Sequence, residues 1–320
     1  MNVAVVGCGL IGRKRVQAMP PGTRVVALAD LDRSRAEALA ATLPYPATVT
    51  ADAAEAVAGA DVAIVATVHS ALAECAIAAL KAGCHVLVEK PGGRDLADLR
   101  AIADAAAAAG KVVRVGFNHR FHPALLKAKE LSTSYGPLIY VRGRYGHGGR
   151  LGYEKEWRAD KASSGGGELV DQGVHLIDLT RYLVGDVDLA FAEMRTDFWP
   201  MAVEDNAYLA LRPRGGGFAW LHASWTEWKN IFSLELAFRE AKLEIFGLGG
   251  SYGTERLTLY EMLPEMGPPP TTIWEYPRGD ASWQRELVDV LGAIAGAEPL
   301  GAGLEDSIAA FTVVEEAYAR

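Results

Sequence analysis

The sequence predicts a two-domain protein of the α/β plus α+β class. Its N-terminal domain is expected to contain a doubly wound parallel sheet, and its C-terminal domain a large, mainly antiparallel open sheet. Over about the first 120 residues, short β-branched runs alternate with alanine-rich helical stretches, which is the pattern of βαβ units. Farther along, long alternating or aromatic-rich strands follow one another without intervening helices, which favours an antiparallel sheet with one open face.

The elements of the first part follow from this alternation. Strands are expected at 3–6, 24–29, 62–66, 85–88 and 112–116, and helices at 13–19, 33–42, 53–58, 71–81 and 97–109. A chain of 320 residues exceeds the size at which one hydrophobic core stops growing. We therefore expect a domain boundary between the α/β domain at 1–119 and the α+β domain at 120–320.

The second part is expected to begin with a helix and a strand, followed by a glycine- and charge-rich loop. A further helix then ends at Gly185, where a glycine stop is expected. In chain order, the expected elements are a helix at 123–131, a strand at 138–145, a loop at 146–167, strands at 190–198, 206–211, 217–224, 233–238, 242–246 and 257–260, and helices at 283–295 and 304–319.

Composition argues against several classes of partner. The formal net charge is −8 and no basic stripe is present, so nucleic acid and anionic membranes are poor candidates. No apolar run approaches the length of a membrane span, and Met1 leads into strand residues without the basic region of a signal peptide. Three cysteines without metal-ligand spacing fit a reducing compartment. We expect a soluble, cytoplasmic protein.

The most specific motif is a glycine turn that directly follows the first expected strand. Its first glycine permits the tight turn, its second lets backbone approach a pyrophosphate, and its third lets the next helix pack closely on the strand. The helix N-terminus presents free N–H groups to the phosphates. The second strand ends in an acid where this fold binds the adenosine ribose. The predicted dinucleotide site comprises Gly7, Gly9, Leu10, Ile11, Gly12 and Asp30.

The acid at the second strand also bears on the choice of dinucleotide. A carboxylate at Asp30 repels a ribose 2′-phosphate, which favours NAD over NADP. Arg33 and Arg35 follow closely and offer positive charge for that phosphate, so NADP stays open as an alternative.

A second candidate site lies at the end of the fourth expected strand, in Glu89-Lys90-Pro91. Ligands of open parallel sheets bind beyond the carboxyl ends of the strands. We therefore expect Lys90 to direct its charge at the nicotinamide. The alternative is a surface lysine paired with Glu89.

A third candidate site is the helix that follows Gly165–Gly167. Asp171 and His175 are four residues apart, so they are neighbours on one helix face, which Asp178 continues. A carboxylate beside an imidazole can orient the ring for general acid/base chemistry. A solvated helix face and a metal pair remain alternatives. A third protein ligand is missing from the local sequence, so no metal is expected.

Together these motifs resemble the Gfo/Idh/MocA family, named for glucose–fructose oxidoreductase, inositol dehydrogenase and a rhizopine-catabolism protein. The resemblance covers nearly the whole chain and rests on the order of the glycine turn and the segments 66–69, 82–91, 116–121 and 165–175. It implies that the catalytic set is Lys90, Asp171 and His175. It also implies that Pro91 follows a cis peptide bond and that further dinucleotide contacts come from Thr67, His69, Glu89 and Asn118.

The chain departs from the family pattern at two positions. Val68 stands where many members carry proline, so the family pattern does not determine the shape of that loop. His119 stands where many carry arginine or tyrosine, and we assign it no chemistry.

The resemblance implies a function as well as a site. It implies NAD(P)-dependent hydride transfer between the nicotinamide and a secondary alcohol or ketone carbon of a sugar, cyclitol or nucleotide sugar. His175 would be the general acid/base and Lys90 would polarise the oxygen. The alternatives are a non-sugar substrate, such as a dihydrodiol or an amino-acid-like ligand, and a non-catalytic NAD-binding sensor.

Two further expectations concern the C-terminal domain. Trp157 and Arg158, in the loop before the catalytic helix, are candidate substrate contacts, although Trp157 is equally suited to pinning that loop to the core. The segment containing Trp225 and Trp228 lines either the pocket or an interface. A homodimer or homotetramer through the C-terminal sheet is expected, because an open apolar face must be covered.

Overall fold

The computed structural model describes residues 1–265, 267–277 and 279–320. They form two compact units, each assembled from separate stretches of chain. The first unit comprises Met1–Asn118, Ala162–Gly165 and Trp283–Ala309, and the second comprises His119–Lys161, Gly166–Ser282 and Ala310–Arg320. The expected domain boundary between residues 119 and 120 remains a prediction.

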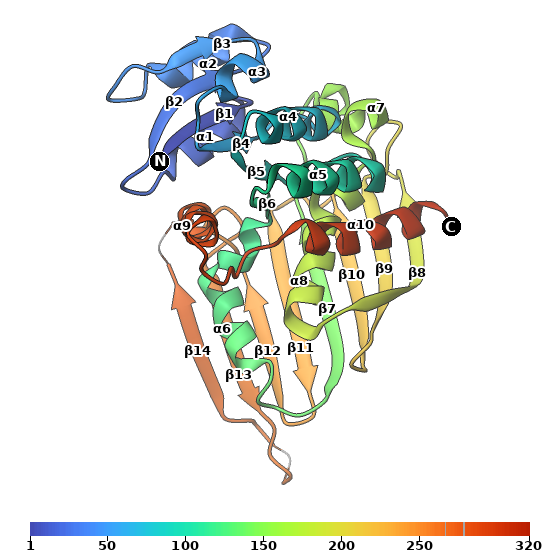
Figure 1. The fold of residues 1–320 in the computed structure, drawn as a ribbon. Helices are drawn as coiled ribbons and strands as arrows, with labels where there is room; N and C mark the ends of the chain where they lie inside the picture. Colours follow the sequence, from blue (N-terminus) through green and yellow to red (C-terminus); the bar gives the residue numbers. More distant parts are fainter. Residues whose placement is uncertain (266, 278) are drawn as a thin grey trace. The chain divides into compact units, whose positions relative to one another are not determined.

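The first unit contains the predicted doubly wound parallel sheet (Figure 1). Its six strands lie in the order β3-β2-β1-β4-β5-β6, and the paired strands run parallel. The strands are β1 (Asn2–Val6), β2 (Arg24–Ala29), β3 (Thr48–Thr50), β4 (Val62–Val65), β5 (His85–Glu89) and β6 (Val113–Gly116). The first five helices are α1 (Leu10–Gln17), α2 (Arg33–Ala40), α3 (Ala53–Val57), α4 (His69–Lys81) and α5 (Leu96–Ala109).

Burial explains why the N-terminal pattern was easy to recognise. The residues of β1 after Asn2 are buried, as is the whole of β4. Such runs are typical of parallel strands covered on both faces. The core joins Val5, Ile64 and Leu87 of the sheet to Leu287 and Val290 of helix α9, which spans Ser282–Ile294.

The second unit contains the predicted open sheet, with eight strands in the order β14-β13-β12-β11-β7-β10-β9-β8. Among the described strands, β7 and β10 pair in parallel and the other neighbours are antiparallel. The strands are β7 (Leu138–Gly146), β8 (Val187–Arg195), β9 (Asn206–Pro213), β10 (Phe218–Ser224), β11 (Ile231–Phe238), β12 (Ala241–Phe246), β13 (Glu255–Glu261) and β14 (Thr271–Tyr276).

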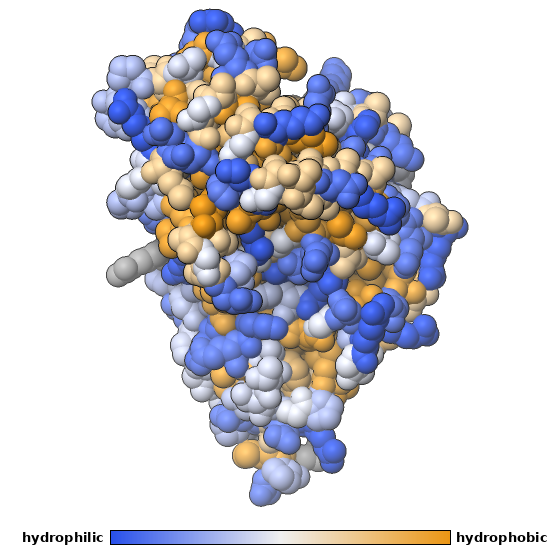
Figure 2. All heavy atoms as spheres, in the orientation of Figure 1, coloured by the Kyte–Doolittle hydropathy of each residue, from blue (hydrophilic) through white to orange (hydrophobic). Residues whose placement is uncertain are grey.

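One face of this sheet is covered by helices α6 (Pro123–Leu131) and α8 (Val174–Val184), as Figure 1 shows. From that side, Figure 2 shows a mixture of hydrophilic and hydrophobic residues over α6 and the adjacent strands. Large apolar side chains elsewhere on the sheet are exposed, including Phe191 and Trp220, whose rings stack 6.2 Å apart. Helix α10 spans Leu304–Tyr318. Within the described ranges, no helix is long and apolar enough to cross a membrane.

Several predicted boundaries were wrong. The first helix begins at Leu10, not Arg13, because the glycine turn leads directly into it and the Arg13 N–H already bonds to the Gly9 carbonyl. The expected loop at 146–167 contains short helical turns at Tyr153–Lys155, Trp157–Ala159 and Lys161–Ser164. Strand β8 ends at Arg195, because the carboxylate of Asp205 binds the following backbone N–H groups instead of a strand partner.

Candidate active site

Two glycines of the turn between β1 and α1 are required by the protein itself. Gly7 has a φ of +95°, and a Cβ there would lie 2.4 Å from the Ala66 carbonyl oxygen. A Cβ on Gly12 would lie 1.9 Å from the carbonyl oxygen of Gly7. The turn and the close packing of the helix therefore explain these positions without a ligand.

Gly9 differs from its two neighbours in the motif. Its φ is −71°, which any residue adopts, and a Cβ there would meet no protein atom within 4 Å. Neither backbone conformation nor packing requires glycine here. A ligand that passes close to the backbone would require it, at the N-terminus where Leu10 and Ile11 begin α1. This position therefore fits a bound pyrophosphate.

The carboxylate of Asp30 is fixed beside the same turn. It accepts hydrogen bonds from the backbone N–H of Cys8 at 2.8 Å and from that of Asp32 at 2.9 Å. Arg33 pairs with Glu37 at 2.9 Å on the exposed face of α2. The predicted ribose carboxylate is thus held in one orientation at the end of β2, while Arg33 is engaged on its own helix.

The remaining predicted dinucleotide contacts of this unit follow other strands at their carboxyl ends. Thr67 and His69 follow β4, and Asn118 follows β6. His69 is buried, and its Nδ1 lies 2.8 Å from the carbonyl oxygen of Ser164. Because the strands are parallel, these residues share the sheet edge that carries the glycine turn.

Lys90 and Pro91 follow β5 at that same edge. The peptide bond between them is cis, as expected from the family resemblance. Lys90 is partly exposed, and the Pro91 carbonyl oxygen accepts a 2.5 Å hydrogen bond from the hydroxyl of Ser307. The predicted cation therefore lies beyond the carboxyl end of an interior strand, where ligands of this sheet type bind.

Glu89 takes part in a buried ionic cluster. The fully buried Arg15 lies with Nε 2.5 Å from Glu89 and a terminal nitrogen 2.6 Å from Glu286. The guanidinium also lies 4.6 Å from the ring centre of Trp283. Burial raises the pKa of Glu286 to about 7, with Arg15 lowering it and Glu89 raising it. The cluster joins the end of β5 to α1 and α9.

In the second unit, Asp171 and His175 lie on two consecutive helical segments. Asp171 belongs to a π-helical turn at Leu169–Gly173, and His175 to the first turn of α8. The predicted helix is thus present but begins with a wider turn, a feature that often accompanies functional sites. His175 is buried, whereas Asp171 is partly exposed.

Arg158 is an ion-pair partner of Asp171. Its Nε lies 3.1 Å from Asp171, and another nitrogen lies 3.7 Å from Glu156. The guanidinium also stacks on the ring of Trp157, 4.6 Å from its centre. Arg158 and Trp157 therefore form one cluster beside Asp171, a member of the predicted catalytic set.

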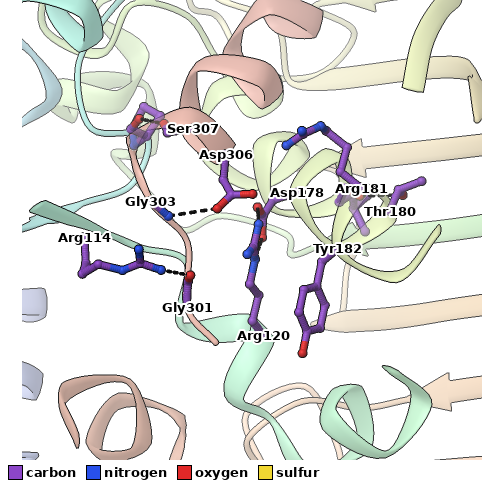
Figure 3. Close-up of polar contacts among 12 residues, drawn as sticks. Arg114, Arg120, Asp178, Thr180, Arg181, Tyr182, Gly301, Gly303, Asp306 and Ser307 are labelled. Atoms are coloured by element: carbon purple, nitrogen blue, oxygen red, sulfur yellow. Dashed lines mark hydrogen bonds and ion pairs between the residues drawn. The ribbon is translucent and has the colours of Figure 1, made fainter. Parts of the chain in front are cut away.

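Asp178, expected to continue the face of Asp171 and His175, contributes to another contact. Its two oxygens accept hydrogen bonds from Arg120 at 2.9 and 2.5 Å (Figure 3). Both side chains are buried. This pair connects α8 to the segment that precedes α6.

Sequence reasoning assigned no chemistry to His119, yet its ring lies on His175. The two ring centres are 3.8 Å apart, and His119 Nε2 lies 3.0 Å from the hydroxyl of Tyr145. The departure from the family pattern at position 119 was the sequence signal that could have drawn attention to this residue.

Comparison with known proteins identifies both parts of the chain. Residues 1–117 match a family model described as oxidoreductase family, NAD-binding Rossmann fold. Residues 125–253 match the model of the GFO/IDH/MocA C-terminal domain.

Individual relatives agree with these matches. The D-glucoside 3-dehydrogenase of Escherichia coli strain K12 is 30% identical over 249 residues, covering 70% of each chain. A levoglucosan dehydrogenase of Pseudarthrobacter phenanthrenivorans is 35% identical over 136 residues, which span 41% of this chain but only 35% of that protein. A solved structure of levoglucosan dehydrogenase in complex with NADH shares the fold, with a TM-score of 0.87 at 22% identity, covering 100% of this chain and 97% of that one.

Proposed function

Because the chain belongs to the Gfo/Idh/MocA family of oxidoreductases, with their NAD-binding Rossmann domain, we propose that it is an NAD-dependent dehydrogenase of sugars, cyclitols or nucleotide sugars. The reacting group is a secondary alcohol, or the ketone in the reverse direction. Relatives named as dehydrogenases of D-glucosides and of levoglucosan support this substrate class.

The observation that carries the proposal is the open backbone at Gly9. In the proposed complex, the pyrophosphate lies against Gly9 and the first N–H groups of α1, and the ribose binds the carboxylate of Asp30. Further contacts come from Thr67, His69 and Asn118. The fixed Asp30 supports NAD over NADP.

Three side chains perform the chemistry in this proposal. When bound, NAD supplies the hydride acceptor. His175 accepts the proton of the substrate hydroxyl and returns it in the reverse reaction. Lys90 stabilises the negative charge that develops on the same oxygen. Asp171, held by Arg158, orients the hydroxyl or the imidazole.

Glu89 serves as a support for Lys90 in this mechanism. Its carboxylate is held by Arg15, so the end of β5 is fixed immediately before Lys90. Trp157 and Arg158 form the side of the substrate pocket next to Asp171, and Arg158 contributes mainly by orienting that carboxylate.

A substrate panel tests the proposal. Purified protein is incubated with NAD and, separately, levoglucosan, methyl glucoside, myo-inositol and UDP-N-acetylglucosamine, while NADH formation is followed by absorbance. We expect turnover of at least one compound, and a loss of about 10²- to 10³-fold in kcat for Lys90→Met with NAD binding retained. NAD binding without turnover of any panel member would contradict the proposed substrate class. A parallel assay with a trans-dihydrodiol and a 2-hydroxy acid then separates a non-sugar enzyme from a sensor.

We also propose a homodimer or homotetramer formed through the open face of the eight-stranded sheet. Exposed Phe191, Phe218 and Trp220 support this assembly, because large apolar side chains on a sheet face gain by being covered. Light scattering of the purified protein should show a multiple of the chain mass, and Trp220→Lys should reduce it. The free cysteines Cys8, Cys75 and Cys84 support a cytoplasmic location.

A further inference from the structure

We propose that His119 is a positioning residue that holds the imidazole of His175 in one orientation. This inference rests on the proposed function, because it takes His175 to be the group that exchanges the proton. The ring centres lie 3.8 Å apart with an angle of 31° between the planes, so the two rings are in close contact at a tilt. Both residues are buried.

A chain of hydrogen bonds fixes the ring of His119. Its Nε2 lies 3.0 Å from the hydroxyl of Tyr145, which is hydrogen-bonded to the hydroxyl of Tyr252. The hydroxyl of Tyr252 in turn accepts a hydrogen bond of 3.2 Å from the side-chain amide of Gln172. Gln172 belongs to the π-helical turn that precedes α8. The hydrogen bonds thus begin at Gln172, immediately before α8. The contact between the rings of His119 and His175 leads back to α8.

The tyrosine at the centre of this chain stays a neutral phenol. Burial raises the pKa of Tyr145 well above its ordinary value, and the neighbouring Tyr252, Asp171 and Glu168 raise it further. Tyr145 therefore keeps its proton and remains a hydrogen-bonding group at neutral pH. His119 has a constant partner.

The backbone around His119 is also fixed on both sides. The adjacent Arg120 forms the bidentate pair with Asp178 of α8, as Figure 3 shows. Three residues after His119, His122 Nδ1 lies 2.8 Å from Glu255, which also accepts the backbone N–H of Ala124 at 2.7 Å. The segment is therefore joined to α8 on one side and to β13 on the other, and His119 has little freedom to move away from His175.

This arrangement has a consequence for proton exchange. A general base works when its nitrogen lies within hydrogen-bond reach of the proton that it removes, and a displacement of about 1 Å costs on the order of 10²-fold in rate. A ring packed against His175 on one face limits rotation of that imidazole. His119 needs no contact with the substrate for this effect.

The first test requires no substrate. Nitrogen-15-labelled histidine spectra are recorded with NAD present, and the His175 signals are assigned by their loss in His175→Gln. We expect one set of narrow signals in the wild type, and shifted or broadened signals in His119→Ala. His85→Gln is the control, because His85 lies in the first unit, where its Nδ1 accepts a hydrogen bond from the backbone N–H of Val112. Unchanged His175 signals in His119→Ala would overturn the proposal, whatever the enzyme's activity.

The second test is kinetic and uses levoglucosan and myo-inositol as substrates. We expect His119→Ala to lower kcat by about 10- to 100-fold with KM changed less than about twofold. His119→Phe keeps a stacked ring and should recover most of this loss, and Tyr145→Phe should fall between the two. A rise in KM with constant kcat would overturn the proposal by making His119 a substrate contact.

These outcomes separate two kinds of failure. If the wild type turns over neither compound nor any other panel member, the proposed function is contradicted while the spectra still decide whether His119 orients His175. If His119→Ala does not fold, Tyr145→Phe and His119→Phe carry the kinetic test. Equal kcat in the wild type, Tyr145→Phe and His119→Phe would then contradict the positioning role.

Discussion

The glycine turn of the first unit and the α8 region of the second are built from different parts of the chain. At the turn, the candidate binding groups are backbone N–H groups, an open Cα at Gly9 and one carboxylate fixed by backbone. Around α8, the candidate groups are side chains in contact with other side chains. Asp171 pairs with Arg158, and the ring of His175 contacts that of His119. A site built from backbone groups is sensitive to substitution at only a few positions, such as its glycines. A site built from side chains depends on several partners that are distant in the sequence.

The largest expected effect comes from breaking the side-chain region alone. His175→Gln should lower kcat by about 10²- to 10⁴-fold, because the proton of the substrate hydroxyl loses its acceptor. The Kd for NAD, measured by calorimetry, should stay unchanged. His85→Gln, a histidine outside both regions, is the control, and it should retain full activity. Wild-type kcat in His175→Gln would remove His175 from the mechanism.

A substitution in the glycine turn alone should instead weaken NAD binding. In Gly9→Ala, the new methyl group occupies space needed by the pyrophosphate, so the Kd for NAD should rise by about 5- to 150-fold, or roughly 1–3 kcal/mol. The melting temperature without NAD should barely change, since that methyl group meets no protein atom.

Gly215→Ala provides the matched control for this experiment. Gly215 is an exposed turn glycine with an ordinary φ, and a Cβ there would lie 4.0 Å from its nearest neighbour, the Val184 carbonyl oxygen. It should change neither NAD binding nor stability. Gly12→Ala, by contrast, should unfold at lower temperature, because its Cβ would lie 1.9 Å from the Gly7 carbonyl. Equal NAD affinity in Gly9→Ala and Gly215→Ala would show that no ligand passes Gly9.

The same contrast explains how much of the molecule could be predicted from its sequence. The six-residue glycine turn and Asp30 are local patterns, and both sheets follow from the spacing of apolar residues. The three-residue strand β3 was missed because Thr48-Val49-Thr50 is too short to show a period. Strand β14 was missed because most of its residues are exposed and carry no buried pattern.

The missed site contacts have a different physical cause. Arg15 finds its partner Glu89 at a separation of 74 residues. Between His119 and His175 the chain forms α6, β7 and several short helical turns. No local period encodes such pairs. The π-helical turn that carries Asp171 was also hidden, because the apolar spacing of 169–183 fits an ordinary helix. Side-chain partners become visible only once the fold brings them together.

A smaller effect should sharpen the description of the backbone region. Asp30→Ala should raise the Kd for NAD by about tenfold, since a charge-assisted hydrogen bond to the ribose is lost. It should also reduce the protein's preference for NAD over NADP. Asp30→Asn separates charge from geometry, because an amide oxygen can still accept the N–H of Cys8. Both variants should bind NADP better relative to NAD. An unchanged ratio would place the ribose elsewhere.

The smallest expected effect concerns stability and the buried cluster of Arg15, Glu89 and Glu286. Burial raises the pKa of Glu286 from 4.5 to about 7, so the folded protein binds this proton more tightly than the unfolded chain. The stabilisation from that proton is complete below about pH 4.5 and is lost as pH rises through about 7. The melting temperature of the NAD-free protein should therefore fall over this range, by about 2–4 °C for each kcal/mol lost.

Glu286→Gln removes the titration and keeps a polar group of the same size beside Arg15. The melting temperature of the wild type should fall relative to that of the variant, steadily between about pH 5 and pH 8. Glu298→Gln, at an exposed carboxyl, should follow the wild type throughout. Parallel curves for wild type and Glu286→Gln would mean that Arg15 keeps Glu286 ionised in the folded protein. The cluster of Arg15, Glu89 and Glu286 would then stay ionised throughout this pH range, and its contribution to stability would not depend on pH.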